Sequence, residues 1–261
     1  MTAAALSEPA ADAAIGAACQ LLHLPTVRAQ AAELADQAAR ERLTHRGYLA
    51  ELLAAETDAR DARRRDRRLK EAKFPRVKRL DGFDLHAAPG IPPATLATLA
   101  AGTWIDHGQP LVLLGDSGTG KTHLLIGVGV AACEQGRSVR YLTCAALVNE
   151  LVEAADERRL AKTIGRYGRL DLLCCDELGY LHLDPRGAEL LFQVITEREE
   201  RASIAVASNA PFSEWGQTFT DPRLAAAVVD RLTFNAHILQ TGTQSYRLRA
   251  TTGRKKGAAA T

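Results

Sequence analysis

The stretch Gly115-Asp116-Ser117-Gly118-Thr119-Gly120-Lys121-Thr122 matches the pattern G-x-x-x-x-G-K-[ST] at every fixed position. An apolar run at 111–114 precedes it and is typical of a buried strand, and residues 123–128 are typical of the start of a helix. This order of strand, glycine-rich loop and helix predicts a phosphate-binding loop rather than a chance glycine-rich turn. The glycines let backbone N–H groups point toward an anion, and the following helix presents its positive end to the same anion.

Two side chains of this loop carry specific chemistry. Lys121 is expected to reach the β- and γ-phosphates of a nucleotide, and the hydroxyl of Thr122 is expected to be a ligand of Mg²⁺. Residues 115–122 therefore predict a site for ATP and Mg²⁺.

From Pro110 onward, apolar runs alternate with stretches of helical periodicity. The alternation predicts an α/β fold, a mainly parallel sheet flanked by helices on both faces. The predicted strands are Leu111–Gly115, Ser138–Thr143, Leu170–Asp176, Ser203–Ser208 and Ala236–Gln240, with Ser245–Arg249 as a candidate edge strand. The predicted helices are Thr122–Glu134, Ala145–Arg159, Gly187–Arg201 and Pro222–Leu232.

Two adjacent acids, Asp176 and Glu177, end one of the apolar runs about 55 residues after the phosphate loop. Because the carboxyl ends of parallel strands meet at one edge of a sheet, both carboxylates are expected beside the loop. Asp176 would hold Mg²⁺ through water. Glu177 would orient and deprotonate the attacking water.

Three further residues are candidates for the same site. Asn209 follows the next apolar strand and is expected to hydrogen-bond the γ-phosphate or the attacking water, although a turn-forming role before Pro211 is the alternative. Negative charge that develops on the γ-phosphate is commonly met by an arginine from a neighbouring subunit. Arg231 is the first choice for this role and Arg223 the second; each could instead form a surface ion pair.

The part of the chain before the predicted sheet has a different composition. Residues 1–75 are expected to form a small helical N-terminal segment, disordered up to about residue 10, with two or three helices broken near Pro25 and at 44–47. Thr44 is a candidate cap of the third helix. Residues 76–109 are interpreted as a connecting arm with one short helix, Ala94–Trp104, and residues 251–261 as a disordered tail. In the arm, Phe83 could lie near a bound base or pack against the core.

A dense basic run lies between Arg60 and Arg79. It contains eleven Lys or Arg residues and three acids, so it carries a net charge of +8, whereas the whole chain carries only +2. Such a run predicts contact with the phosphate backbone of duplex DNA. The alternative is a solvated helix face followed by a linker.

The bulk composition excludes several classes of protein. The chain has 261 residues, of which 46% are apolar and 25% charged, as in an ordinary globular protein. Its five cysteines form no C-x-x-C pair, which argues against a disulfide framework or a zinc site. We expect a cytoplasmic protein without a membrane span, since no run of about 20 apolar residues and no signal peptide is present.

Together these motifs resemble the IstB family, the ATPases that help the transposition of bacterial insertion sequences and are related to the DnaC helicase loaders. The resemblance spans about residues 10–250. The nucleotide motifs are shared by many ATPases, and two of the stretches given next narrow the choice of family. The residues that carry the resemblance are Gly115–Thr122, Asp176-Glu177-Leu178-Gly179-Tyr180, Ser208-Asn209, Phe212-Ser213-Glu214-Trp215 and Asp230-Arg231-Leu232 with His237. The narrowing stretches are those that begin at Asp176 and at Phe212.

The resemblance implies an AAA+ core at residues 110–250 without a separate helical lid domain. It implies ATP-dependent homo-oligomers on duplex DNA that recruit and stimulate a transposase, with an arginine finger completing each ATP site in trans. The N-terminal segment is expected to contact the partner or DNA.

Three alternatives stay open at this point. A DnaC-like helicase loader would prefer single-stranded DNA, a phosphate-loop kinase would transfer the phosphoryl group to a small molecule, and a scaffold would carry an inactive nucleotide site. The Asp-Glu pair and the strand that ends at Asn209 favour water as the acceptor. The presence of Lys121, Thr122 and both acids disfavours an inactive site.

Overall fold

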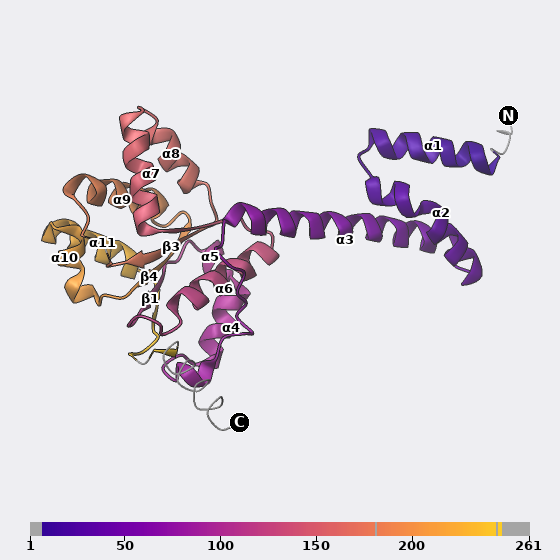
Figure 1. Ribbon diagram of the computed structural model, residues 1–261. Helices are drawn as coiled ribbons and strands as arrows, with labels where there is room; N and C mark the ends of the chain where they lie inside the picture. The colour runs from indigo at the N-terminus through magenta and orange to yellow at the C-terminus, as the bar shows by residue number, and fades with distance from the viewer. Residues whose placement is uncertain (1–6, 181, 244, 247–261) are drawn as a thin grey trace, which may run out of the picture. The chain divides into compact units, whose positions relative to one another are not determined.

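The computed structural model describes residues 7–180, 182–243 and 245–246. The chain divides into two compact units, Met1–Asp66 and Arg67–Thr261. The boundary falls inside helix α3 (His45–Ala72), which therefore contributes residues to both units (Figure 1).

The first unit contains α1 (Glu8–Leu21), α2 (Pro25–Arg40) and the first part of α3. Three helices are thus confirmed, and α1 begins at Glu8, so residues 8–10 are helical rather than disordered as expected. The predicted cap is also confirmed, since the N–H of Gly47 donates to Thr44 Oγ1 over 3.1 Å. The unit has a small core, as its length allows; the buried residues of the core cluster are Cys19, Val27, Ala31 and Leu52.

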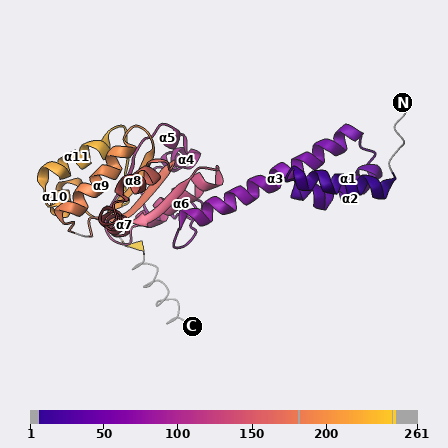
Figure 2. The same ribbon diagram turned by 90° about the horizontal axis from the view of Figure 1, so that it is seen from above.

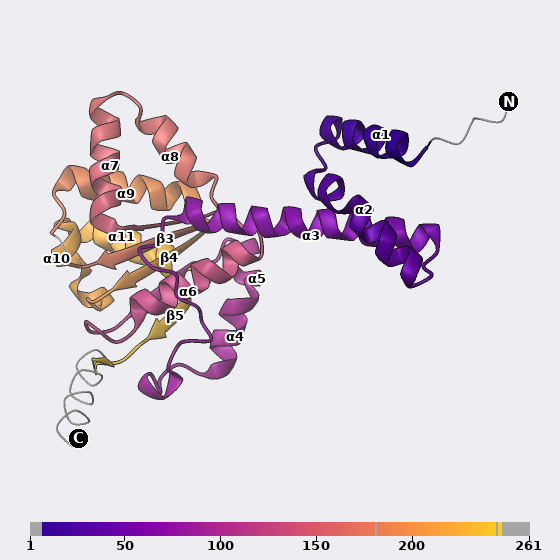
Figure 3. The same cartoon turned by 45° about the vertical axis from the view of Figure 1, so that its right-hand side comes forward.

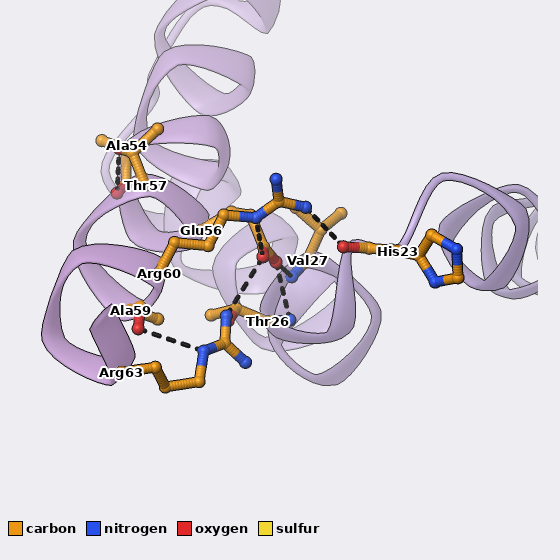
Figure 4. Close-up of polar contacts among 9 residues, drawn as sticks. All are labelled: His23, Thr26, Val27, Ala54, Glu56, Thr57, Ala59, Arg60 and Arg63. Atoms are coloured by element: carbon orange, nitrogen blue, oxygen red, sulfur yellow. Dashed lines mark hydrogen bonds and ion pairs between the residues drawn. The ribbon is translucent and has the colours of Figure 1, made fainter. Parts of the chain in front are cut away.

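A buried carboxylate holds α2 against α3. Glu56 on α3 accepts hydrogen bonds from the N–H groups of Thr26 and Val27 over 2.8 and 3.1 Å, where α2 has no cap from its own N-cap side chain (Figure 4). The same carboxylate binds Arg60 and Arg63 over 3.0 and 3.2 Å. Burial raises the pKa of Glu56, but Arg60 and the two N–H groups outweigh it and lower the pKa from 4.5 to about 2.

The second unit is built on a five-stranded parallel sheet in the order β2-β3-β4-β1-β5. The strands are β1 (Leu111–Leu114), β2 (Val139–Thr143), β3 (Leu172–Leu178), β4 (Ser203–Ser208) and β5 (His237–Gln240), the last labelled in Figure 3. All five predicted strands are confirmed. Ser245 and Tyr246 belong to no strand, and the rest of the candidate edge strand lies outside the described residues.

Helices cover both faces of this sheet (Figure 2). On one face α6 (Lys121–Glu134) packs with α4 (Pro93–Ala101), α5 (Thr103–Asp106) and the end of α3. The other face carries α7 (Cys144–Asp156), α8 (Leu160–Gly168), α9 (Pro185–Arg198), α10 (Trp215–Phe219) and α11 (Pro222–Thr233). Two single-turn helices, η1 (Leu85–Ala87) and η2 (Phe212–Glu214), complete the elements. Among the described residues, no helix is both long and apolar enough to cross a membrane.

Two predicted helices differ in the structure, one because it is divided and the other because it ends earlier. The arm helix predicted at 94–104 splits into α4 and α5 at Gly102, which has φ +74° and would place a Cβ only 2.5 Å from the Arg137 side chain. The helix predicted at 145–159 ends at Asp156, and Arg158, with φ +56°, turns the chain before the unpredicted α8. Residues 251–261 lie outside the described part.

Candidate nucleotide-binding site

The predicted phosphate loop connects β1 to α6. Its three glycines have positive φ angles, +148° at Gly115, +82° at Gly118 and +102° at Gly120. A Cβ on Gly115 would lie 2.4 Å from Thr241 Oγ1, and a Cβ on Gly120 would lie 2.8 Å from the ring of Phe83. The loop therefore needs glycine for its backbone conformation and for the close approach of neighbouring groups.

The loop backbone also positions the predicted phosphate-binding lysine. Lys121 is the first residue of α6 and is only 8% exposed. Its Nζ donates to the carbonyl oxygens of Gly115 and Asp116 over 2.6 and 2.8 Å. The ammonium group is thus held beside the backbone that would surround the phosphates, at the positive end of α6.

Asp176, the predicted magnesium carboxylate, is 3% exposed near the carboxyl end of β3. Its Oδ2 accepts a hydrogen bond from the hydroxyl of Tyr141 on β2 over 2.7 Å, and its Oδ1 accepts from the N–H of Glu177 over 2.9 Å. Burial, together with the bond to Asp176, raises the pKa of Tyr141 well above its ordinary value, so the phenol stays a donor.

Glu177 has a left-handed backbone conformation, with φ +63°. The pairing of β3 with β4 shifts register between Cys175 and Leu178, so Glu177 lies in an irregular part of the strand. Its side chain is exposed and lines the cavity described below. Both carboxylates line that cavity, the Asp176 group buried and the Glu177 group exposed.

Asn209, just after the end of β4, carries an unsatisfied polar atom. Its Oδ1 is buried and has no hydrogen-bond partner among the described residues. Since buried side-chain oxygens are nearly always paired in folded proteins, this atom indicates a missing partner such as water or a ligand group. Asn209 lines the same cavity as Lys121 and Glu177, which favours the predicted role over that of a turn residue alone.

These groups meet in a cavity of about 350 Å³. Its walls come from the phosphate loop, the end of β3, the residue after β4 and the arm before β1; among the lining residues are Lys78, Phe83, Ala87, Thr122, His123, Tyr180 and Tyr246. Phe83 packs against the core and also lines the cavity, with its ring edge-on to His123 at 5.5 Å. One placement of Phe83 is therefore compatible with both alternatives, packing against the core and lying near a bound base.

The residues present fit ATP and Mg²⁺. The loop glycines leave room that side chains would fill, and Asn209 Oδ1 lacks a partner in the described structure. Thr122 and Asp176 offer a hydroxyl and a carboxylate, the hard oxygen donors that suit Mg²⁺.

The two candidate finger arginines lie elsewhere. Arg231 on α11 donates to Glu199 over 2.8 Å and stacks over the ring of Phe192 at 4.4 Å. It lines a second cavity, beside the amino ends of β1 and β4. Arg223 is exposed near the start of α11. Neither arginine is among the described residues that line the nucleotide cavity, so a role for either in ATP hydrolysis would require a neighbouring subunit.

Sequence reasoning missed Tyr141, which holds Asp176 from a neighbouring strand. The register places Tyr141 beside Cys174, so its hydroxyl must reach along the sheet to the carboxylate. A tyrosine inside a predicted strand is an ordinary β-forming residue. Its role becomes visible only when the two strands are paired.

Relatives of this chain are named for ATP binding and for insertion sequences. A protein of insertion sequence IS5376 from Geobacillus stearothermophilus is 37% identical over 231 residues, which is 88% of this chain and 92% of that protein. One of insertion sequence IS21 from Pseudomonas aeruginosa is 37% identical over 216 residues, or 83% and 82% of the two chains.

The fold has counterparts among solved structures. AMPPCP-bound DnaA from Aquifex aeolicus superposes with a TM-score of 0.54 at 20% identity, over 70% of this chain and 56% of that one. The likeness shows that this chain shares its fold with that protein. The family of IstB-like ATP-binding proteins matches residues 17–253, nearly the whole chain. By this match, and by the identity to its insertion-sequence relatives, the chain belongs to the IstB-like family of ATP-binding proteins.

Proposed function

We propose that the protein is a Mg²⁺-dependent ATPase that helps DNA transposition, assembling on duplex DNA and stimulating a transposase. The observation that carries the ATPase part is the single cavity that gathers Lys121, Asp176, Glu177 and the unsatisfied Oδ1 of Asn209. The transposition part rests on the relatives, which are named for insertion sequences.

Each residue has a distinct task in this proposal. Lys121 binds the β- and γ-phosphates of ATP, while Thr122 and Asp176 would hold Mg²⁺, which neutralises charge on the phosphates. Glu177 orients a water molecule for attack on the γ-phosphorus and takes its proton. Asn209 donates to the γ-phosphate through its amide or accepts from the attacking water through Oδ1.

Contact with DNA rests on the basic run, in which the structure separates ten of the eleven cations into two groups; the eleventh, Lys78, lines the nucleotide cavity. The ion-paired group is Arg60 and Arg63 with Glu56, Arg67 and Arg68 with Glu71, and Arg79 with Glu134. The second group is exposed and has no ion pair within the described residues; it consists of Arg64, Arg65, Lys70, Lys73 and Arg76. We propose that this second group contacts the DNA phosphates.

A double variant tests the DNA contact without disturbing the Glu56 cluster. Loss of two phosphate contacts in R64A/R65A should weaken duplex binding and reduce the slope of log K against log salt by about 1.8. K162A/R169A, which removes two exposed cations outside the run, is the matched control and should leave the slope unchanged. An unaltered slope in R64A/R65A would assign those arginines to a solvated helix face.

ATP turnover with no DNA, with duplex and with single-stranded DNA, at one fixed low salt concentration, tests the function as a whole. Stimulation mainly by duplex supports a transposition helper, whereas stimulation mainly by single strands would indicate a DnaC-like helicase loader. Turnover that responds to neither DNA would contradict the role of the basic run. Gene context tests the partner: a transposase gene next to this one, whose product the protein stimulates, would support the transposition helper.

A further inference from the structure

The hydrogen bond from Tyr141 to Asp176 joins two strands at the candidate magnesium site. It is 2.7 Å long, and its acceptor is a carboxylate that is only 3% exposed. A hydrogen bond to an ionised acceptor is stronger than one between neutral groups. The phenol therefore restricts the rotation of the Asp176 carboxyl group and fixes which lone pairs remain free.

The second oxygen of the carboxylate is restrained as well. Its Oδ1 accepts a hydrogen bond from the N–H of Glu177 over 2.9 Å. Glu177 itself has a left-handed backbone. One donor on each oxygen fixes the plane of the group, while each oxygen keeps a further lone pair. Without Tyr141, the Asp176 side chain would be held from one side only.

Tyr141 is itself held by an aromatic neighbour. The ring centroid of Phe74 lies 6.0 Å from that of Tyr141, with an interplanar angle of 52°. Phe74 follows the end of α3 and fits against Gly129 of α6, where a Cβ would lie 2.8 Å from its ring. Phe74, which lies within the basic run, thus packs against the residue that holds Asp176.

We infer that Tyr141 is a positioning residue that orients Asp176 for Mg²⁺, and that Phe74 seats Tyr141 for this task. The inference rests on the proposed function, because it concerns the same magnesium site. Groups that orient a metal-binding side chain typically contribute 10- to 100-fold to metal affinity or activity. Tyr141 does not touch the reacting atoms and acts only through Asp176.

The test measures how much Mg²⁺ the full chain needs to bind a fluorescent, non-hydrolysable ATP analogue. In Y141F, which keeps the ring and loses only the hydroxyl, half-saturation should require about tenfold more Mg²⁺. Y167F is the matched control, since Tyr167 donates to Glu150 over 2.6 Å between α8 and α7, and neither residue lines the cavity. Y167F should leave the Mg²⁺ requirement unchanged.

A second variant separates the effect of the Tyr141 hydroxyl from that of the ring packed against it. F74L keeps the Tyr141 hydroxyl and should raise the Mg²⁺ requirement by a smaller factor; no change in F74L would overturn the role of Phe74. The melting temperature of each variant without nucleotide shows whether an effect is merely structural.

The outcomes distinguish the inference from the function on which it rests. A wild-type protein that binds the analogue in a Mg²⁺-dependent manner, together with an unchanged or lower requirement in Y141F, overturns the inference alone. A wild-type protein whose binding ignores Mg²⁺ overturns the magnesium site and the inference together. An equal shift in Y141F and Y167F would also overturn the inference, because the effect would then not depend on Asp176.

Discussion

Replacing Glu177 by glycine is expected to stabilise the protein relative to alanine at the same position while ATP hydrolysis is lost. Glu177 has φ +63°, a left-handed conformation that costs an L-residue about 1–2 kcal/mol. Glycine avoids this cost but loses about 0.5–1 kcal/mol through the greater entropy of its unfolded chain. The side chain is exposed, so little packing is lost with it.

The difference in free energy of unfolding between E177G and E177A isolates the cost of the left-handed backbone, since both variants lack the carboxylate. The mid-range values of the two terms leave about 0.75 kcal/mol in favour of glycine. For a unit of this size, 1 kcal/mol corresponds to about 2–4 °C, so E177G should melt about 1.5–3 °C above E177A. The assay is thermal unfolding of the full chain without nucleotide, followed by circular dichroism.

Turnover should be lost in every variant that lacks the carboxylate, whatever its stability. E177Q, E177A and E177G should all bind ATP, but their turnover, followed by phosphate release, should fall by about 10²- to 10⁴-fold because the general base is missing. An E177G variant that melts below E177A would refute the claim that the backbone at position 177 is strained for residues other than glycine. Turnover of E177Q within a few-fold of the wild type would refute the role of Glu177 as base.

Three further predictions concern other parts of the chain. K121A should lose measurable binding of a fluorescent ATP analogue, because the loop then has no ammonium group against the β- and γ-phosphates; wild-type affinity would contradict the loop assignment. If Arg231 acts in trans, E177Q and R231A should each be inactive alone, and mixing them should restore part of the turnover, whereas an inactive mixture would shift attention to Arg223. Since the pKa of Glu56 is lowered from 4.5 to about 2, its carboxylate stabilises the first unit above about pH 4.5, and this contribution is lost as the pH falls toward 2. The melting temperature of the wild type should therefore drop more between pH 6 and pH 3 than that of E56Q, and parallel curves would contradict this.

The sequence by itself predicted the parallel sheet and most of the candidate site. Its strands are short apolar runs bounded by turn residues, and their alternation with helical stretches leaves few arrangements other than a parallel sheet. The phosphate loop is contiguous, so its glycines, Lys121 and Thr122 are visible as one pattern. Asp176, Glu177 and Asn209 were found because each lies at or beside the carboxyl end of a strand.

The end of a helix was harder to predict from local sequence. The division of the arm helix at Gly102 and the turn at Arg158 before α8 both depend on single residues with positive φ. Alanine-rich stretches near them favour an uninterrupted helix in the sequence. A residue with a left-handed backbone interrupts the helix at each place despite that local preference.

Only the tertiary structure decided how the charges and the site are held. The basic run is one feature in the sequence, but Glu56, Glu71 and Glu134 bind some of its arginines and leave others exposed. Tyr141 reaches Asp176 across 35 positions of the chain, and the register of two parallel strands creates that contact. Local patterns determine which elements form, because they depend on neighbouring residues, whereas bonds between distant side chains depend on how those elements pack.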